Sequence, residues 1–154
     1  MTCELRLTRV IGLPVILGQR LAGHVERARL TPDGRQLAGL VIRRGLGGAR
    51  WVSRETICVL GDVSVVLRGA PTRLSGESAA PPHRVTDESG LTLGRVTDAW
   101  LQPDTLQISA LEVSLGPIED LRQGRLRVRH WDLQSGSDDT RHILIRRNEW
   151  EVLT

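Results

Sequence analysis

The sequence repeats itself, and this internal duplication limits the folds that the chain can adopt. When the 154 residues are aligned with themselves at a shift of 71 positions, residues 23–45 match residues 94–116 without a gap. The length alone allows one ordinary domain of about 150 residues, but the duplication favours two very small ones. The nine identical pairs are Gly23/Gly94, Val25/Val96, Ala28/Ala99, Leu30/Leu101, Pro32/Pro103, Asp33/Asp104, Gln36/Gln107, Leu40/Leu111 and Gly45/Gly116.

A segment rich in Gly, Pro, Ser and Ala, from Gly69 to Pro82, separates the two copies. Because this composition does not sustain a helix or a central strand, we expect a first repeat over 1–70, a linker over 71–82 and a second repeat over 83–154. Residues 1–74 contain twelve Arg and five acidic residues (+7), whereas residues 75–154 contain nine Arg and thirteen acidic residues (−4). The opposite charges predict that the repeats pack on each other, or on a second chain, with Arg–carboxylate pairs at the rim of an apolar contact.

Short apolar runs of strand length dominate both copies. The segments 37–43 and 106–114 are aliphatic and β-branched without a helical polar face, and Thr31-Pro-Asp-Gly34 suits a type I turn between strands. Further strands are predicted at 50–53, 62–68, 126–133 and 142–146, and only 117–122 is typical of a helix, of about one turn. We therefore predict an all-β fold of two tandem small barrels with at most short helical turns.

The alternation of side chains in the predicted strands changes phase at the same place in both copies. The change falls between Val25 and Ala28 and again near Thr97, which predicts a β-bulge in each copy, of the kind that bends a sheet into a small barrel. We expect Gly23 and Gly94 to be structural glycines at barrel corners. The four residues predicted to point into the cores are Leu40, Ile42, Leu111 and Val113. On the opposite face, Val41 is predicted to point outward, as a contact between the repeats or between copies of the chain.

The order of these segments resembles the PRC-barrel family, named for the cytoplasmic domain of the photosynthetic reaction centre H subunit. The resemblance lies in a G-x-x-L-G-x-V-like entrance followed by a hairpin and a closing strand. The first copy contains an extra residue, Ala22, in that entrance, and the second lacks a Val-rich closing strand at the matching distance. The segments that carry the resemblance are 11–16, 18–25, 40–42, 51–57 and 62–66 in the first copy, and 87–96 and 111–113 in the second.

The resemblance implies a function in binding rather than in catalysis. PRC-barrels act as small platforms that dock on larger assemblies, such as a membrane complex or, in the ribosome maturation factor, a ribosomal protein. We therefore expect a protein-binding or adaptor module. The alternative is an RNA- or ribosome-associated factor similar to that maturation factor, although its other barrel is not recognisable in this chain. The tryptophans, at 51, 100, 131 and 150, are also too scattered to form a stacking platform for bases.

The strongest candidate for a partner-binding surface is an Arg-rich segment of the first copy. It consists of Arg43, Arg44, Arg50 and Arg54 around Trp51, and this combination of guanidinium forks with a flat apolar anchor is common at interfaces. The alternative is that Trp51 packs under a barrel end while the arginines are solvated. A second cluster, at 125, 127 and 129, alternates with apolar residues, which is typical of either a charged docking face or an ordinary solvated strand.

The sequence contains no recognisable catalytic or metal-binding pattern. The histidines, at 24, 83, 130 and 142, have no ligand spacing, and we interpret the acidic residues at 138 and 139 as part of a polar hairpin tip. Cys3 and Cys58 form no C-x-x-C pair, and Cys58 is expected to be buried. We expect no enzyme activity, no metal and no cofactor. Because no apolar run approaches the roughly 20 residues of a membrane span and no signal-peptide core is present, we expect a cytoplasmic protein.

Overall fold

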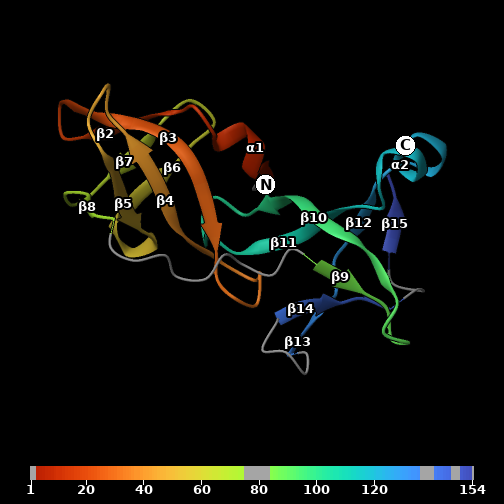
Figure 1. The fold of residues 1–154 in the computed structure, drawn as a ribbon. Helices are drawn as coiled ribbons and strands as arrows, with labels where there is room; N and C mark the ends of the chain where they lie inside the picture. Colours follow the sequence, from red (N-terminus) through yellow and green to blue (C-terminus); the bar gives the residue numbers. More distant parts are fainter. Residues whose placement is uncertain (1–2, 75–83, 136–140, 147–149, 154) are drawn as a thin grey trace.

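The chain folds into two mainly antiparallel β-sheets that lie side by side (Figure 1). This computed structural model describes residues 3–74, 84–135, 141–146 and 150–153. Within these residues, helical structure is limited to three short segments, in agreement with the predicted all-β fold: α1 (Leu7–Val10), η1 (Arg54–Thr56) and α2 (Pro117–Gln123).

The strands of the first sheet are β2 (Pro14–Leu17), β3 (Arg20–Leu30), β4 (Leu37–Arg43), β5 (Ala49–Ser53), β6 (Ile57–Leu60), β7 (Val65–Leu67) and β8 (Thr72–Arg73). The strands of the second sheet are β9 (Arg84–Thr86), β10 (Thr92–Leu101), β11 (Ile108–Ser114), β12 (Leu126–Val128), β13 (Asp132–Ser135), β14 (Arg141–Leu144) and β15 (Trp150–Val152), and β1 (Leu5–Arg6) pairs with β10. We call residues 14–73 the first repeat and residues 84–152 the second repeat.

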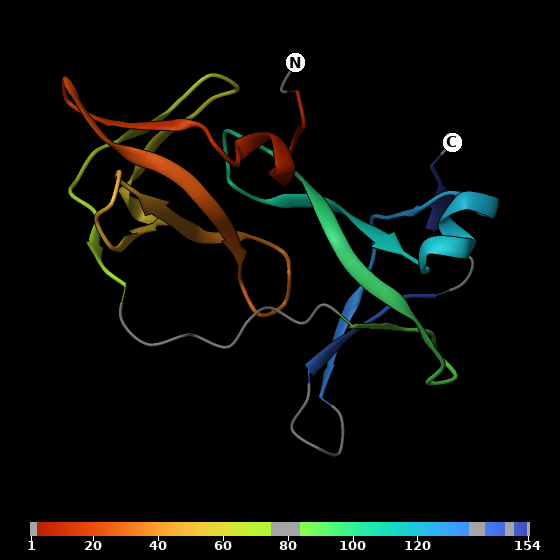
Figure 2. The same cartoon turned by 45° about the horizontal axis from the view of Figure 1, so that its top comes forward.

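The two sheets have the same strand order, which confirms the duplication in the topology. From edge to edge the first runs β6-β7-β2-β3-β4-β5-β8 and the second runs β13-β14-β9-β10-β11-β12-β15. In each repeat the first strand pairs in parallel with a late strand, β2 with β7 and β9 with β14. This pairing curls each sheet into a barrel-like unit (Figure 2). The second repeat thus has a closing strand, β14, in spite of its different sequence.

Equivalent β-bulges bend the long strands of both repeats, as predicted from the change of side-chain phase. The register of β3 against β4 shifts between Val25 and Arg27, and that of β10 against β11 shifts between Val96 and Asp98. An extra residue on one strand increases its bend and twist, so the bulges help the sheets to curl. Beside the first bulge, a Cβ added to Gly23 would lie 2.8 Å from the Arg43 carbonyl oxygen, which explains the need for glycine.

The hydrophobic core extends through both repeats as one cluster. The four residues predicted to point inward have no exposed surface, which confirms that prediction, and large side chains of both sheets join them. The fully buried members include Leu37, Leu40, Ile42 and Val52 of the first repeat and Leu101, Leu111, Val113 and Val128 of the second. Because the core is shared, the repeats are not two independent domains joined only by a linker.

The repeats meet at equivalent positions of their central hairpins. Gln36 in the β3–β4 turn forms an antiparallel bridge with Gln107 in the β10–β11 turn, and these residues are 71 positions apart. The Leu37 N–H donates to the Leu106 carbonyl at 2.9 Å, and the Ile108 N–H donates to the Arg35 carbonyl at 2.8 Å. The contact is therefore built like the self-complementary interface of a two-fold dimer.

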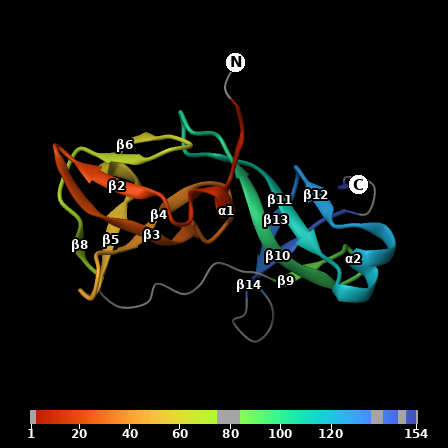
Figure 3. The same ribbon diagram turned by 90° about the horizontal axis from the view of Figure 1, so that it is seen from above.

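The amino-terminal segment crosses from the first repeat to the second. Arg6 of β1 pairs with Trp100 of β10, and α1 lies between the two sheets (Figure 3). At the other boundary, β8 belongs to the first sheet although it begins at Thr72, within the expected linker over 71–82. Residues 75–83 of that linker lie outside the described residues. Among the described residues, no helix has the length and apolar character needed to cross a bilayer.

Candidate functional site

Two of the predicted partner-binding arginines are engaged within the chain. The Arg43 guanidinium pairs with Glu26 at 2.8 Å, and this hydrogen bond is the main reason why the pKa of Glu26 lies below its ordinary value. Arg54 donates to the Gln36 side chain and, at 2.9 Å, to the Thr105 carbonyl of the second repeat. Arg43 thus braces its own sheet, and Arg54 fastens the junction between the repeats.

Trp51 lies over the outer face of the first sheet. A Cβ added to Gly39 would lie 2.5 Å from the Trp51 ring, so the ring occupies the space above this glycine. The tryptophan is half-buried and stands opposite Val41 in the β4–β5 ladder. The expectation of an outward contact at Val41 needs correction, because this residue has no exposed surface and is not available to a second chain.

The other predicted arginines line an open groove at one end of the first repeat. Arg44 and Arg50 lie there with Arg20, which the sequence analysis did not select, in a groove of about 860 Å³. The groove lies between the β2–β3 turn and the β4–β5 turn, and its remaining lining residues are Leu17, Gly18, Gln19, Leu21, Ala22, Gly47, Gly48 and Pro71. We call this feature the basic groove.

The charges of the basic groove are not neutralised by the described part of the chain. Arg20, Arg44 and Arg50 are exposed, and none of their guanidinium groups has a hydrogen bond or ion pair with a described residue. Arg73 stands opposite Arg50 in the β5–β8 ladder and is also exposed. Four guanidinium groups therefore face solvent at this end of the sheet, where an anionic partner could pair with them.

Exposed aliphatic side chains flank the same groove. Leu46, at the tip of the β4–β5 turn, is fully exposed, and Leu21, in the lining, is 43% exposed. Positive φ angles at Gly18 and Gly45 allow the two tight turns that present these residues. The groove thus offers apolar contact next to its positive charge.

The second predicted arginine cluster is neutralised. Arg127 pairs with Glu4 at 2.6 Å and stacks on Trp100 with 4.5 Å to the ring centroid, and Arg129 pairs with Glu4 at 3.7 Å. Arg125 pairs with Asp120 at 3.4 Å. These arginines therefore hold the amino-terminal segment and α2 against the second repeat, which fits neither a free docking face nor a merely solvated strand.

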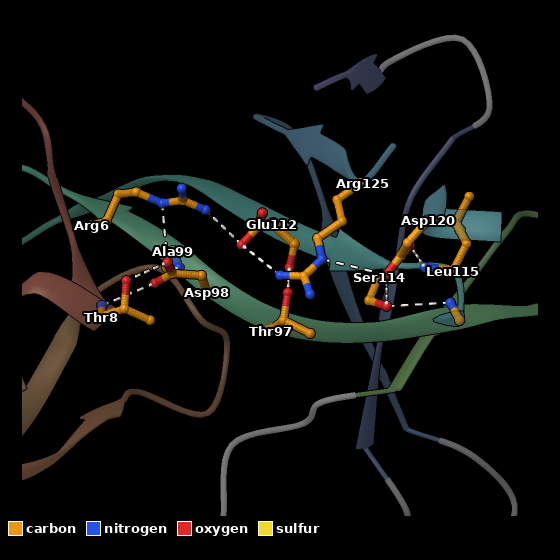
Figure 4. A network of polar contacts seen from close by, with 11 residues as sticks. Arg6, Thr8, Thr97, Asp98, Ala99, Glu112, Ser114, Leu115, Asp120 and Arg125 are labelled. Atoms are coloured by element: carbon orange, nitrogen blue, oxygen red, sulfur yellow. Dashed lines mark hydrogen bonds and ion pairs between the residues drawn. The ribbon is translucent and has the colours of Figure 1, made fainter. Parts of the chain in front are cut away.

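A polar network fixes the amino-terminal segment on the second sheet (Figure 4). Arg6 forms ion pairs with two buried carboxylates, at 3.1 Å to Asp98 and 2.7 Å to Glu112. Thr8 donates its N–H and its hydroxyl to Asp98 at 3.2 Å and 2.9 Å, and the Ala99 N–H donates at 2.8 Å. Because Asp98 already accepts from three donors, the network acts as a clamp rather than as an open site.

The described residues form no group of three or more His, Cys, Asp or Glu side chains that could hold a metal ion. His83 and the acidic residues at 138 and 139 lie outside this part of the chain. Cys58 is exposed, so the prediction of a buried cysteine is wrong. The register of β6 against β7 shifts between Ile57 and Val59, and this irregularity turns Cys58 away from the core.

Comparisons of the sequence with family models and with curated proteins gave no relative. No family model matches the sequence, and no curated protein matches it significantly. The assignment of a function therefore depends on the residues and their geometry alone.

Proposed function

We propose that the chain is a PRC-barrel-like adaptor of the cytoplasm, without catalytic activity or cofactor, that docks on a partner protein through the basic groove. The observation that carries the proposal is the contrast between arginines. Arg6, Arg125 and Arg127 are paired with carboxylates, whereas Arg20, Arg44 and Arg50 have no such partner in the described part of the chain. Solvent-facing guanidinium groups beside exposed leucines suit the rim and anchor of a protein interface.

The alternative partner is RNA, bound through the same charges. The groove contains no aromatic residue in its lining, and single-stranded nucleic acid is usually held by stacking on aromatic side chains as well as by cations. The absence of an aromatic platform in the groove favours a protein partner. The experiment below also detects RNA binding.

The test is site-specific capture with matched charge reversals. A photo-crosslinking amino acid placed at Leu46 in the full chain should capture a protein from an extract of the native host. Capture should be lost in Arg20→Glu/Arg44→Glu/Arg50→Glu and retained in Arg9→Glu/Arg146→Glu, because Arg9 and Arg146 are exposed but do not line the groove. Retention of every captured protein by the groove variant would contradict the proposal. Capture of RNA would support the alternative. In that case the logarithm of the binding constant should fall with the logarithm of the salt concentration, with a slope of about −0.7 for each neutralised phosphate.

A further inference from the structure

The duplication provides a comparison that indicates what the basic groove binds. The connection from β4 to β5 in the first repeat is a turn over 44–48, whereas the equivalent connection from β11 to β12 contains α2. Both connections lie at the same end of their sheets, because the strands that they join occupy equivalent places in the strand order. The second repeat therefore has an additional element where the first repeat has open space.

The additional element places a carboxylate at the end of β11. Asp120 of α2 accepts from the Ser114 hydroxyl at 2.5 Å and from the Leu115 N–H at 2.9 Å, and it pairs with Arg125 at 3.4 Å (Figure 4). Helix α2 has no buried residue, so these polar bonds rather than apolar packing hold it in place. The second repeat thus closes this end of its sheet with its own acidic side chain.

The first repeat has cations at the corresponding positions; Glu26 neutralises Arg43, whereas Arg44 has no acidic partner among the described residues. The shift of 71 residues places Arg43 and Arg44 where the second repeat has Ser114 and Leu115. Arg44 and Arg50 have no acidic partner among the described residues. The short turn over 44–48 leaves them exposed.

We propose that the basic groove binds a short acidic segment of a partner protein, in which a carboxylate is flanked by aliphatic residues as it is in α2. The inference rests on the proposed function and names the chemistry of its partner. The carboxylate would pair with Arg44 and Arg50, and the neighbouring aliphatic residues would contact Leu21 and Leu46. In α2 the aliphatic residues Ile118 and Leu121 are 71% and 89% exposed, so α2 serves as the precedent for the bound carboxylate, and the aliphatic contacts are inferred from the exposed Leu21 and Leu46 of the groove.

The probe for this inference is a heptapeptide with the sequence of residues 117–123, Pro-Ile-Glu-Asp-Leu-Arg-Gln, blocked at both ends. Titration of the ¹⁵N-labelled full chain should shift amide resonances over 17–22 and 44–50. A peptide with Asn in place of its Asp should bind at least about fivefold more weakly, because carboxylate–guanidinium bonds are stronger than neutral ones. Arg44→Glu/Arg50→Glu should abolish the shifts, and Arg9→Glu/Arg146→Glu should preserve them. The dispersion of each variant's own spectrum reports whether it is folded.

Three results would overturn the inference: no shifts in the groove, equal binding of the Asn peptide, or stronger binding of a single-stranded RNA oligonucleotide at the same resonances. The failure of the proposed function is distinguishable from these. If the peptide does not bind but capture at Leu46 still depends on the groove arginines, the proposed function stands and the partner has a different chemistry. If the peptide binds and the groove variants retain all captured proteins, the adaptor function is wrong and the carboxylate preference remains.

Discussion

The two repeats share one topology but cover the outer faces of their central strands by different means. In the first repeat, the ring of Trp51 lies over Gly39, and Val41 beside it has no exposed surface. In the second repeat, Arg127 and Glu112 occupy the positions equivalent to Trp51 and Val41. Both form ion pairs with the amino-terminal segment, Arg127 with Glu4 and Glu112 with Arg6. The two repeats thus keep the same backbone arrangement although the side chains at equivalent positions differ in polarity and charge. The first repeat covers this face with its own apolar side chains, whereas the second repeat covers it through ion pairs with the amino-terminal segment.

The largest expected effect concerns the shared core. Leu40→Ala and Leu111→Ala each remove a fully buried side chain, one in each repeat. Such truncations cost about 2–5 kcal/mol, which is most of the stability of a small protein. Because the core is continuous, urea unfolding followed by circular dichroism should show one transition that both variants shift alike. Two transitions, each moved by only one variant, would mean that the repeats unfold independently.

The next effect sharpens the comparison between the outer faces. Gly39→Ala forces a methyl group against the Val52 carbonyl oxygen and the ring of Trp51 and should destabilise the chain by about 1–3 kcal/mol through overpacking. The matched change in the second repeat is Ala110→Gly at the equivalent buried position, which should cost about 1–2 kcal/mol from backbone entropy and the loss of a buried methyl group. The urea concentration at the midpoint of unfolding measures the stability change of both variants. A urea midpoint for Gly39→Ala equal to that of the unchanged chain would show that the Trp51 ring and the Val52 carbonyl can both move aside.

A smaller effect tests the clamp. Arg6→Ala leaves the buried carboxylates of Asp98 and Glu112 with fewer partners. Because the Arg6 side chain is itself 40% exposed, solvent screens the loss, and we expect about 1–2 kcal/mol. The double variant Arg6→Ala/Glu112→Gln should recover part of this stability, since it removes a buried charge that keeps only the more distant Arg125, at 3.8 Å. Equal midpoints for Arg6→Ala and the unchanged chain would show that the clamp contributes nothing.

The smallest effect concerns acid stability at α2. The hydroxyl of Ser114 is the main cause that holds the pKa of Asp120 below its ordinary value of 3.8; burial opposes it, and the Leu115 N–H and Arg125 assist. A depressed pKa in the folded state stabilises the protein above the ordinary value, and this contribution is lost as the pH falls through the lowered pKa. Asp120→Asn should therefore flatten the dependence of the urea midpoint on pH below about 5. An unchanged profile would mean that α2 is not held through this carboxylate.

The sequence predicted the parts of the fold that depend on local pattern. The repeat, the two bulges and the inward positions of residues such as Leu40 and Leu111 follow from side-chain alternation, which is a property of neighbouring residues. The pairing of Gln36 with Gln107 follows no local pattern, although its equivalent positions are visible in the alignment of the two copies.

The remaining features depend on contacts between distant segments. Alternation indicates that Val41 faces outward. It does not indicate that the ring of Trp51, on the neighbouring strand, covers that face. The bond from Arg54 to the Thr105 carbonyl and the pair of Arg127 with Glu4 join residues 51 and 123 positions apart. No periodicity connects such residues, so the sequence could not separate paired arginines from free ones.

The central claim is that an open basic end distinguishes the first repeat from the second. It is tested most directly by replacing the turn over 45–48 with the α2 connection over 116–124, which keeps Arg44 and Arg50, and measuring the affinity of the grafted chain for the acidic heptapeptide. If the graft covers the groove with its own carboxylate, as α2 covers the second repeat, binding should be lost to the same extent as in Arg44→Glu/Arg50→Glu, with the urea midpoint preserved. A folded graft that binds the peptide as tightly as the unchanged chain would contradict the account.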